Sequence, residues 1–213
     1  MEAYRFDLAG AKLSALASGA LYWEREGLLV LSDLHLGRSE RIARLGGTLL
    51  PPYEVGDTLA RLEADLAGTG ARRVVCLGDT FDDRAAADLG EDHRRWLARM
   101  MAGRRWTWIA GNHDPSPLAL DGDHRDELAI APLTFRHIAR PDATGEVSGH
   151  YHPKIRLAGQ ARPAFLTDGN RLILPAYGTY TGGMPAGTPA LRSLFGPQAL
   201  AILTGRPLLA VPF

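Results

Sequence analysis

The sequence has one cysteine, Cys76, among its 213 residues. A single thiol excludes an intramolecular disulfide framework and any zinc site built from several thiolates. Such scarcity is typical of proteins that work in a reducing compartment, so we expect the chain to be cytoplasmic.

The sequence also lacks net charge, because 24 lysine and arginine residues balance 24 aspartate and glutamate residues. This excludes a globally basic nucleic-acid-binding surface but leaves room for a local basic patch. No apolar run approaches the roughly 18 residues of a membrane span, and the first residues lack the charged-then-apolar order of a signal peptide. We therefore expect no membrane partner. Without repeats or low-complexity linkers, residues 1–213 are expected to form a single domain.

Short apolar runs alternate with amphipathic segments in the first half of the chain. Buried strands are predicted at 28–32, 73–77 and 106–110, one or two more within 12–23, and helices at 57–67 and 92–102. A stretch rich in Gly, Arg and Pro, running through Pro52, predicts a loop after the first of these buried strands. The second half is mostly strand, at 133–137, 146–148, 171–174 and 199–203. This order predicts a sheet-rich α/β layered domain.

Polar residues stand where four of the predicted strands end. The segments are Ser32-Asp33-Leu34-His35, Gly78-Asp79-Thr80-Phe81-Asp82, Gly111-Asn112-His113-Asp114 and Gly149-His150-Tyr151-His152. Open α/β sheets bind ligands at the carboxyl ends of their strands, and glycine lets the backbone turn and approach a ligand closely. We therefore expect these segments to meet at one edge of the sheet.

The side chains of these segments offer oxygen and nitrogen, but no sulfur, to a cation. Such a donor set favours Mn²⁺, Fe, Zn²⁺ or Co²⁺. The D-x-H and H-x-H spacings place both side chains of each pair on the same side of an extended segment. There are more donors than one ion needs, and an aspartate at a strand end can bridge two ions about 3.5–4 Å apart. The sequence therefore predicts a two-metal hydrolytic site.

Five motifs in the order D-x-H, G-D-x-x-D, G-N-H-D, a lone His and G-H-x-H resemble those of the metallophosphoesterase (calcineurin-like phosphoesterase) superfamily. The resemblance implies an α/β fold, a β-sandwich flanked by helices in four layers (α-β-β-α). It implies that Asp33, His35 and His152 hold one metal ion, that Asn112, His137 and His150 hold a second, and that Asp79 bridges the two. It also implies that His113 is a catalytic histidine outside the ligand set and is polarised by Asp114.

Two histidines compete for the position of the lone histidine. His137 ends a strand-like run, whereas His124 lies in the acidic stretch 121–127. Because ligands gather at strand ends, we predict His137.

A closer resemblance, over nearly the whole chain, is to the bacterial ligase-associated DNA-damage-response endonucleases. The segments that resemble these proteins are SDLHLGRSERIARLGG, LLPPYEVGDTLARL, GNHDPSP, FRHIARP with GEVSGHYHPK, and LILPAYGTYTGG. This resemblance implies a Mn²⁺-dependent phosphodiesterase or nuclease with a link to DNA repair. It further implies a functional association with an ATP-dependent DNA ligase and a helicase.

Four charged residues have two interpretations each. Asp82 is either a loop cap or a group that orients a metal ligand. Arg38, Arg41 and Arg44, spaced by three, form either a solvated face or a contact to the phosphate of a substrate.

The leading functional hypothesis is a dinuclear phosphodiesterase or nuclease that acts on nucleic acid or cyclic nucleotides. The first alternative is a phosphomonoesterase that acts on a small phosphorylated metabolite. The second is a catalytically weak protein-binding scaffold of the same fold. The sequence leaves the oligomeric state open, including a homo-oligomer.

Overall fold

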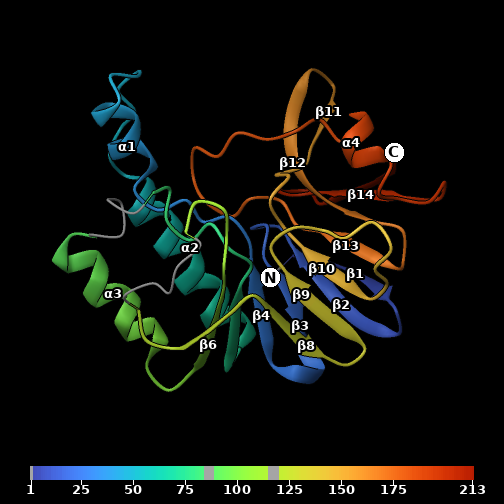
Figure 1. The fold of residues 1–213 in the computed structure, drawn as a ribbon, viewed down its shortest axis with the longest axis horizontal. Coiled ribbons are helices and arrows are strands. Elements are labelled where there is room, and N and C mark those ends of the chain that lie inside the picture. The colour runs from blue at the N-terminus through green and yellow to red at the C-terminus, as the bar shows by residue number, and fades with distance from the viewer. Residues whose placement is uncertain (1, 84–88, 115–119) are drawn as a thin grey trace.

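The computed structural model describes residues 2–83, 89–114 and 120–213, so residues 115–117 of the GNHDPSP segment lie outside it. In these ranges two β-sheets pack face to face, and helices cover their outer faces (Figure 1). The predicted α/β fold, a β-sandwich flanked by helices, is confirmed.

The first sheet has the strand order β1-β2-β3-β4-β5-β6-β7. Its strands are β1 (Ala3–Leu8), β2 (Ala11–Leu16), β3 (Leu21–Trp23), β4 (Leu28–Leu31), β5 (Arg73–Cys76), β6 (Arg105–Ile109) and β7 (Asp123–Arg125). Strands β1 to β4 are antiparallel neighbours, whereas β4 to β7 run parallel. The parallel half places the carboxyl ends of β4, β5 and β6 at the same edge.

The second sheet has the order β15-β14-β12-β13-β10-β9-β8, with β11 paired to β12. Its strands are β8 (Glu127–Ile130), β9 (Leu133–Arg136), β10 (Glu146–Ser148), β11 (Lys154–Leu157), β12 (Gln160–Thr167), β13 (Arg171–Ile173), β14 (Leu200–Leu203) and β15 (Leu209–Pro212). Strand β10 is parallel to both β9 and β13. The ends of β9 and β10 therefore also share an edge.

Side chains from both sheets fill the space between them. Val30 and Val75 from the first sheet pack with Phe135, Phe165 and Ile202 from the second. None of these five side chains is more than 1% exposed. Burial of each stabilises the sandwich by about 1.5–3 kcal/mol, so this apolar layer is what holds the two sheets together.

The helices form the outer layers of the molecule. They are α1 (Arg38–Arg44), α2 (Glu54–Thr69), α3 (Glu91–Met101) and α4 (Pro189–Arg192), with a short 3₁₀ turn at Glu24–Glu26. Leu59 and Leu62 of α2 and Leu97 of α3 pack on the first sheet, and Leu191 of α4 packs on the second. Within the described ranges the fourth layer is thin, because α4 has only four residues. No helix in these ranges has both the length and the apolar character needed to cross a lipid bilayer.

Both predicted helices and the central strands are confirmed within a few residues, whereas six strands were missed: β1, β7, β8, β11, β12 and β15. The loop predicted after β4 was wrong in part, because α1 occupies Arg38–Arg44. Ser39 is the only buried residue of α1, so the sequence has no apolar periodicity from which this helix could be predicted. Gly37, in the left-handed conformation with φ 81°, starts it.

Candidate metal centre

The loops that follow β4 and β5 remain paired beyond the ends of these strands. The backbone N–H of His35 donates to Asp79 O (2.9 Å), that of Leu36 to Thr80 O (2.9 Å), and that of Asp82 to Leu36 O (3.1 Å). This extension of the parallel ladder lays the D-x-H segment beside the G-D-x-x-D segment.

The second sheet contributes histidines from the loops after β9 and β10. The N–H of Gly149 donates to His137 O (2.9 Å), which joins these two loops. The N–H of His150 donates to Asp33 Oδ2 (2.9 Å), and the Ser32 hydroxyl also donates to Oδ2. These bonds tie the strand ends of the two sheets into one site.

Glycines at the strand ends permit this close approach. A Cβ atom on Gly111 would lie 2.2 Å from the backbone nitrogen of Asp79, and one on Gly149 would lie 1.7 Å from Ser32 Oγ. Neither distance is possible between real atoms. The glycines at these junctions were predicted to let the backbone approach a ligand, whereas the structure shows it approaching the neighbouring loop.

The backbone is strained where the candidate ligands stand. In the described part of the chain, eight non-glycine residues have a positive φ. Five of them are candidate ligands: Asp33 (52°), His35 (45°), Asp79 (48°), His150 (70°) and His152 (46°). Such conformations cost about 1–3 kcal/mol each and cluster at functional sites. The fold therefore holds these side chains at an energetic cost.

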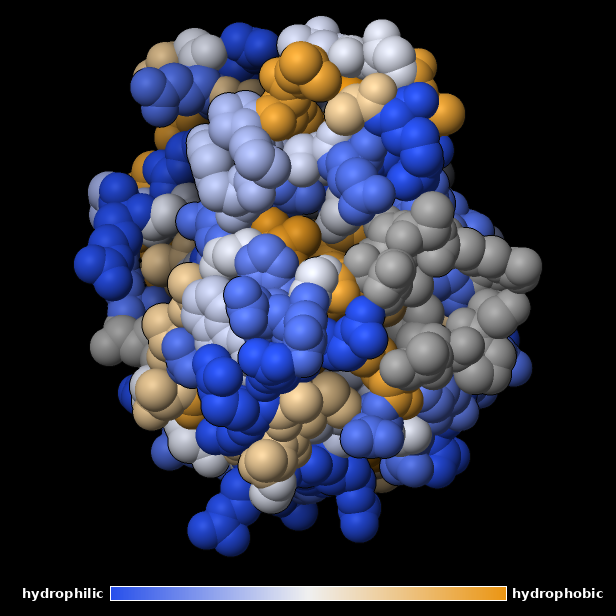
Figure 2. All heavy atoms as spheres, turned by 90° about the vertical axis from the view of Figure 1, so that its left-hand side faces the viewer, coloured by the Kyte–Doolittle hydropathy of each residue, from blue (hydrophilic) through white to orange (hydrophobic). Residues whose placement is uncertain are grey.

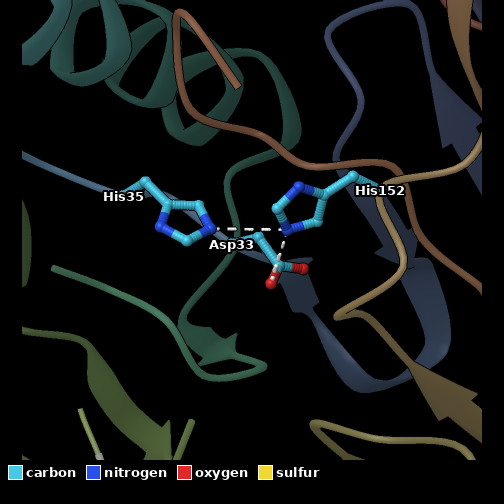
Figure 3. Close-up of side chains that lie close together, drawn as sticks. All are labelled: Asp33, His35 and His152. Atoms are coloured by element: carbon cyan, nitrogen blue, oxygen red, sulfur yellow. Dashed lines mark hydrogen bonds and ion pairs between the residues drawn. The ribbon is translucent and has the colours of Figure 1, made fainter. Parts of the chain in front are cut away.

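A first cluster contains Asp33, His35 and His152, one potential ligand atom from each lying within 4.8 Å of the others. His152 Nε2 lies 3.0 Å from Asp33 Oδ1 and 3.4 Å from His35 Nε2. Both rings point toward each other and toward the carboxylate (Figure 3). Asp33 and His35 are buried, whereas His152 is partly open to solvent.

A second cluster contains Asp79, His137 and His150. His137 Nε2 lies 3.2 Å from His150 Nδ1, 3.5 Å from Asp79 Oδ2 and 2.9 Å from Asn112 Oδ1. Asp79 Oδ2 is also 3.9 Å from His35 Nε2 of the first cluster. Asp79 thus stands between the two clusters.

Neighbouring acceptors determine which nitrogen of two histidines is free. His137 Nδ1 lies 2.6 Å from Leu77 O, and His35 Nδ1 lies 2.8 Å from Asp82 Oδ1. A carbonyl or carboxylate oxygen can only accept, so Nδ1 carries the proton in His137, and the nearby carboxylate favours the proton on Nδ1 of His35 although that contact lacks the angle of a hydrogen bond. The lone pair of Nε2 then faces the cluster, as in metal-ligating histidines.

The residues present fit a pair of cations. Lone pairs of imidazole nitrogens converge at 3.4 Å in the first cluster, an arrangement that repels unless a proton or a cation lies between them. Within the part of the chain that the structure describes, Asp33 Oδ1 is buried with no hydrogen bond of acceptable geometry, although His152 Nε2 lies 3.0 Å away. The buried His/Asp clusters are consistent with a dinuclear metal site.

Two pKa shifts keep ligand groups in the metal-binding form. Burial and the neighbouring His137 ring lower the pKa of His150, which favours the neutral imidazole. Burial opposes ionisation of Asp33, but the neighbouring rings of His152 and His137 leave the pKa of this carboxyl below its usual value.

The structure corrects the predicted role of Asp114. Its buried carboxylate accepts the backbone N–H groups of Asp79 (2.9 Å), Thr80 (2.7 Å) and Phe81 (3.3 Å). Among the described residues, His113 Nδ1 instead lies against Asp82 O, at 2.8 Å. Asp114 therefore shapes the Asp79 loop and does not polarise His113.

Asp82 is not a loop cap. Its carboxylate, 0% exposed, lies 2.8 Å from His35 Nδ1 and accepts from Arg38 Nη1 (2.8 Å) and Arg41 Nη1 (3.0 Å). These partners outweigh the cost of burial and hold the pKa of Asp82 well below its usual range.

The three arginines lie on α1 and not in a loop. Arg44 is directed away from Asp82, toward Glu40 (3.4 Å) and Asp83. Arg38 and Arg41 have side chains only 25% and 32% exposed. The simple solvated face is therefore wrong for Arg38 and Arg41.

His124 is not brought to the site. It lies in β7, and its Nε2 faces Leu120 O at 3.0 Å. His137 is the histidine that the structure brings beside Asp79 and Asn112. Cys76 is buried, and burial raises the pKa of its thiol well above the usual value, so the thiol is a core group.

Tyr177 and Gly178 support the first cluster, although the sequence indicated for Tyr177 only loop packing or stacking on a base. The N–H of Tyr177 donates to Ser32 O (2.7 Å) and that of Gly178 to Asp33 O (3.1 Å). A Cβ atom on Gly178 would lie 1.9 Å from Leu34 O. The only sequence signal was the segment LILPAYGTYTGG, whose glycines mark a close backbone approach.

An open hollow adjoins His137 of the second cluster. Its volume is about 750 Å³. The lining includes Asn112, His137, Ile138 and Arg140. A substrate of nucleotide size therefore has room beside the second cluster.

Comparisons with known proteins agree with this geometry. A family model described as calcineurin-like phosphoesterase matches residues 28–175, more than half of the chain. The crystal structure of nuclease MPE from Pseudomonas putida superposes with a TM-score of 0.80 and 28% sequence identity, covering 99% of this chain and 100% of that one. Yfce, a phosphoesterase from E. coli, covers 87% of this chain and 98% of its own at 16% identity and a TM-score of 0.43, too low to carry an argument. No curated protein sequence matches the chain.

Proposed function

Because the chain belongs to the calcineurin-like phosphoesterase family, we propose that it is a phosphodiesterase or nuclease that uses two divalent ions, Mn²⁺ first among them. Its substrate is a phosphodiester in nucleic acid or a cyclic nucleotide. The observation that carries the proposal is the full-length likeness to a nuclease combined with two adjoining His/Asp clusters.

The ligand assignment follows the clusters. Asp33, His35 and His152 hold one ion, Asn112, His137 and His150 hold the other, and Asp79 lies between them. When bound, two such cations neutralise phosphate charge and lower the pKa of a water molecule toward neutrality. The hollow beside Asn112 and His137 admits the substrate to this side of the centre.

In this proposal His113 supplies a proton to the leaving group. Its Nδ1 donates to Asp82 O, so the opposite nitrogen, Nε2, is the one that exchanges a proton with a substrate. The N–H of His113 also donates to Asp79 Oδ1 (2.8 Å), which fixes the residue to the middle of the metal centre. As an imidazolium, His113 protonates the departing alkoxide, which leaves a diester poorly by itself.

A substrate panel tests the proposal. The protein is stripped with EDTA, reloaded with Mn²⁺, and assayed on a bis-ester and a mono-ester of p-nitrophenol, on single-stranded and duplex DNA, and on 2′,3′-cyclic nucleotides. We expect faster turnover of the bis-ester than of the mono-ester. A strong preference for the mono-ester would make the protein a phosphomonoesterase, and no turnover with any divalent metal would favour a binding scaffold.

Substitutions separate proton transfer from metal binding. His113→Ala should lower turnover of a diester by about 10²–10⁴-fold while both Mn²⁺ ions still bind. Asp79→Asn should weaken the binding of both ions, because its carboxylate lies between the clusters. His124→Ala is the matched control and should behave as the wild type in both assays. Loss of metal from His113→Ala would contradict the assigned role.

The link to DNA repair is a further part of the proposal. It rests on the resemblance to ligase-associated endonucleases and includes the association with an ATP-dependent DNA ligase and a helicase. Deletion of the gene should sensitise cells to DNA damage, and unchanged survival would argue against this link.

A further inference from the structure

The buried carboxylate of Asp82 is shared between the metal centre and helix α1. Oδ1 lies 2.8 Å from both His35 Nδ1 and Arg38 Nη1, and Oδ2 lies 3.0 Å from Arg41 Nη1. An unpaired charge at this depth would cost several kcal/mol. Two guanidinium groups from one helix therefore keep Asp82 ionised and in one orientation.

Helix α1 is held by polar contacts and not by an apolar face. Ser39 is its only buried residue, and Ser39 donates through its N–H (3.2 Å) and its hydroxyl (2.7 Å) to the two carboxylate oxygens of Glu54, itself 3% exposed. Leu45 and Leu49, just after the helix, are 71% and 78% exposed. Figure 2 shows hydrophobic side chains, in orange, exposed at the top of the face that it draws, and α1 lies at the same level in Figure 1.

A helix of seven residues is marginal by itself in water. The position of α1 therefore depends on its two polar anchors, Glu54 on one side and Asp82 on the other. The second anchor also touches a candidate metal ligand, since Asp82 Oδ1 lies 2.8 Å from His35 Nδ1, and Nε2 of the same ring faces His152.

We propose that Arg38 and Arg41 are positioning residues of the first metal cluster, which act on His35 through Asp82. This inference rests on the proposed metal centre. It replaces the interpretation of these arginines as contacts to the phosphate of a substrate. Each guanidinium commits Nη1 to Asp82, and the pair spans both carboxylate oxygens, so removing either one frees the carboxylate to rotate.

The two roles have different consequences. A positioning pair controls how tightly one of the two ions binds, even when no substrate is present. A phosphate contact controls KM and the salt dependence of substrate binding, and leaves metal affinity unchanged.

The test is a calorimetric titration of Mn²⁺ into the EDTA-stripped full chain, without substrate. In the double variant Arg38→Ala/Arg41→Ala, one of the two binding events should weaken by about 10–100-fold, and the other should stay within about twofold. Arg44→Ala is the matched control, because Arg44 lies on the same helix but faces Glu40 and Asp83. It should leave both binding events as in the wild type.

Two further measurements distinguish positioning from a general structural role. The double variant Arg38→Lys/Arg41→Lys keeps the positive charges but lacks the planar guanidinium groups. Its metal affinity should therefore lie between that of the alanine double variant and that of the wild type. At a fixed Mn²⁺ concentration below saturation, kcat of the alanine double variant should fall while KM for the bis-ester stays near wild type.

Three results would overturn the inference. The first is unchanged metal affinity with a raised KM and a smaller salt dependence, which would make the arginines phosphate contacts. The second is equal weakening of both ions, which would make the effect a general loss of structure. If the double variant does not fold, the titration is repeated with Asp82→Asn. The third overturning result is an unchanged affinity of both ions in that variant. A wild type that binds no Mn²⁺ would instead refute the proposed function.

Discussion

Gly149 shows how a single residue lets two loops meet. A Cβ atom there would lie 1.7 Å from Ser32 Oγ and 2.5 Å from Asp33 Oδ2. Both of those atoms belong to the loop after β4, in the other sheet. The absent side chain therefore permits the contact on which the first cluster depends.

Gly149→Ala should displace Asp33 and destabilise the protein by about 1–3 kcal/mol. It should also weaken Mn²⁺ binding. Urea unfolding and calorimetry on the same preparation measure the two effects. Gly187→Ala is the control, because a Cβ atom on this exposed glycine meets nothing within 4 Å. Wild-type affinity in Gly149→Ala would show that the loops can separate without cost to the site.

His150 contributes a pH dependence to the stability of the protein. Burial and the His137 ring lower its pKa in the folded protein below 6.5. As the pH falls through 6.5, the unfolded chain binds a proton that the folded protein does not yet accept. The contribution to stability is therefore full above pH 6.5 and is lost as the pH falls toward the folded pKa.

The metal-free protein should accordingly lose free energy of unfolding between pH 7.5 and pH 5.5. His150→Gln should lose less over the same interval, and His124→Gln should follow the wild type. Urea unfolding at several pH values gives the slopes. Equal slopes in His150→Gln and the wild type would exclude this explanation.

At the scale of elements, the segment after β13 fastens α2 to the site. The Tyr177 hydroxyl donates to Asp65 Oδ2 of α2 (2.9 Å), and the Tyr177 N–H donates to Ser32 O (2.7 Å). Arg61 of α2 lies over the Tyr177 ring at 4.7 Å. One residue thus links a helix, the strand end that carries Asp33, and the sheet-to-sheet junction.

Tyr177→Phe removes the hydroxyl that donates a hydrogen bond to the buried carboxylate of Asp65. Burial already raises the pKa of this carboxyl, so loss of the donor should cost about 1–3 kcal/mol of unfolding free energy. Urea unfolding at pH 7 measures it. Tyr53→Phe, at a side chain 57% exposed, is the control and should change stability by less than about 0.5 kcal/mol. A neutral Tyr177→Phe would mean that water replaces the hydroxyl.

At the scale of the whole molecule, the candidate metal centre lies where the two sheets meet. Asp33 and Asp79 come from the first sheet, and His137, His150 and His152 come from loops of the second. The core between the sheets draws residues from Leu8 to Ile202. We therefore propose that the chain unfolds as one unit, with the metal ions bound only by the folded form.

Mn²⁺ should raise the melting temperature of the EDTA-stripped protein in proportion to the logarithm of its concentration, since it binds the folded form alone. Differential scanning calorimetry should show one transition throughout. Asp79→Asn should reduce the shift. Two separate transitions, of which only one responds to Mn²⁺, would contradict a single unit that shares the metal centre.

The sequence by itself determined the elements whose apolar spacing is local: the buried strands β4, β5 and β6 and the helices α2 and α3. It also named the polar residues at the strand ends, because strand ends, glycines and donor side chains are adjacent in the chain. A one-dimensional pattern carries these features, since each depends on neighbours within a few residues.

Only the tertiary structure decided which groups meet. It brought His137 rather than His124 to Asp79, turned Asp114 toward backbone N–H groups, and paired Arg38 and Arg41 with Asp82. Each of these contacts joins residues about 30–60 positions apart, and its partner is chosen by how two loops pack. Helix α1 belongs with them, because polar anchors from distant segments hold it and no apolar pattern of its own does.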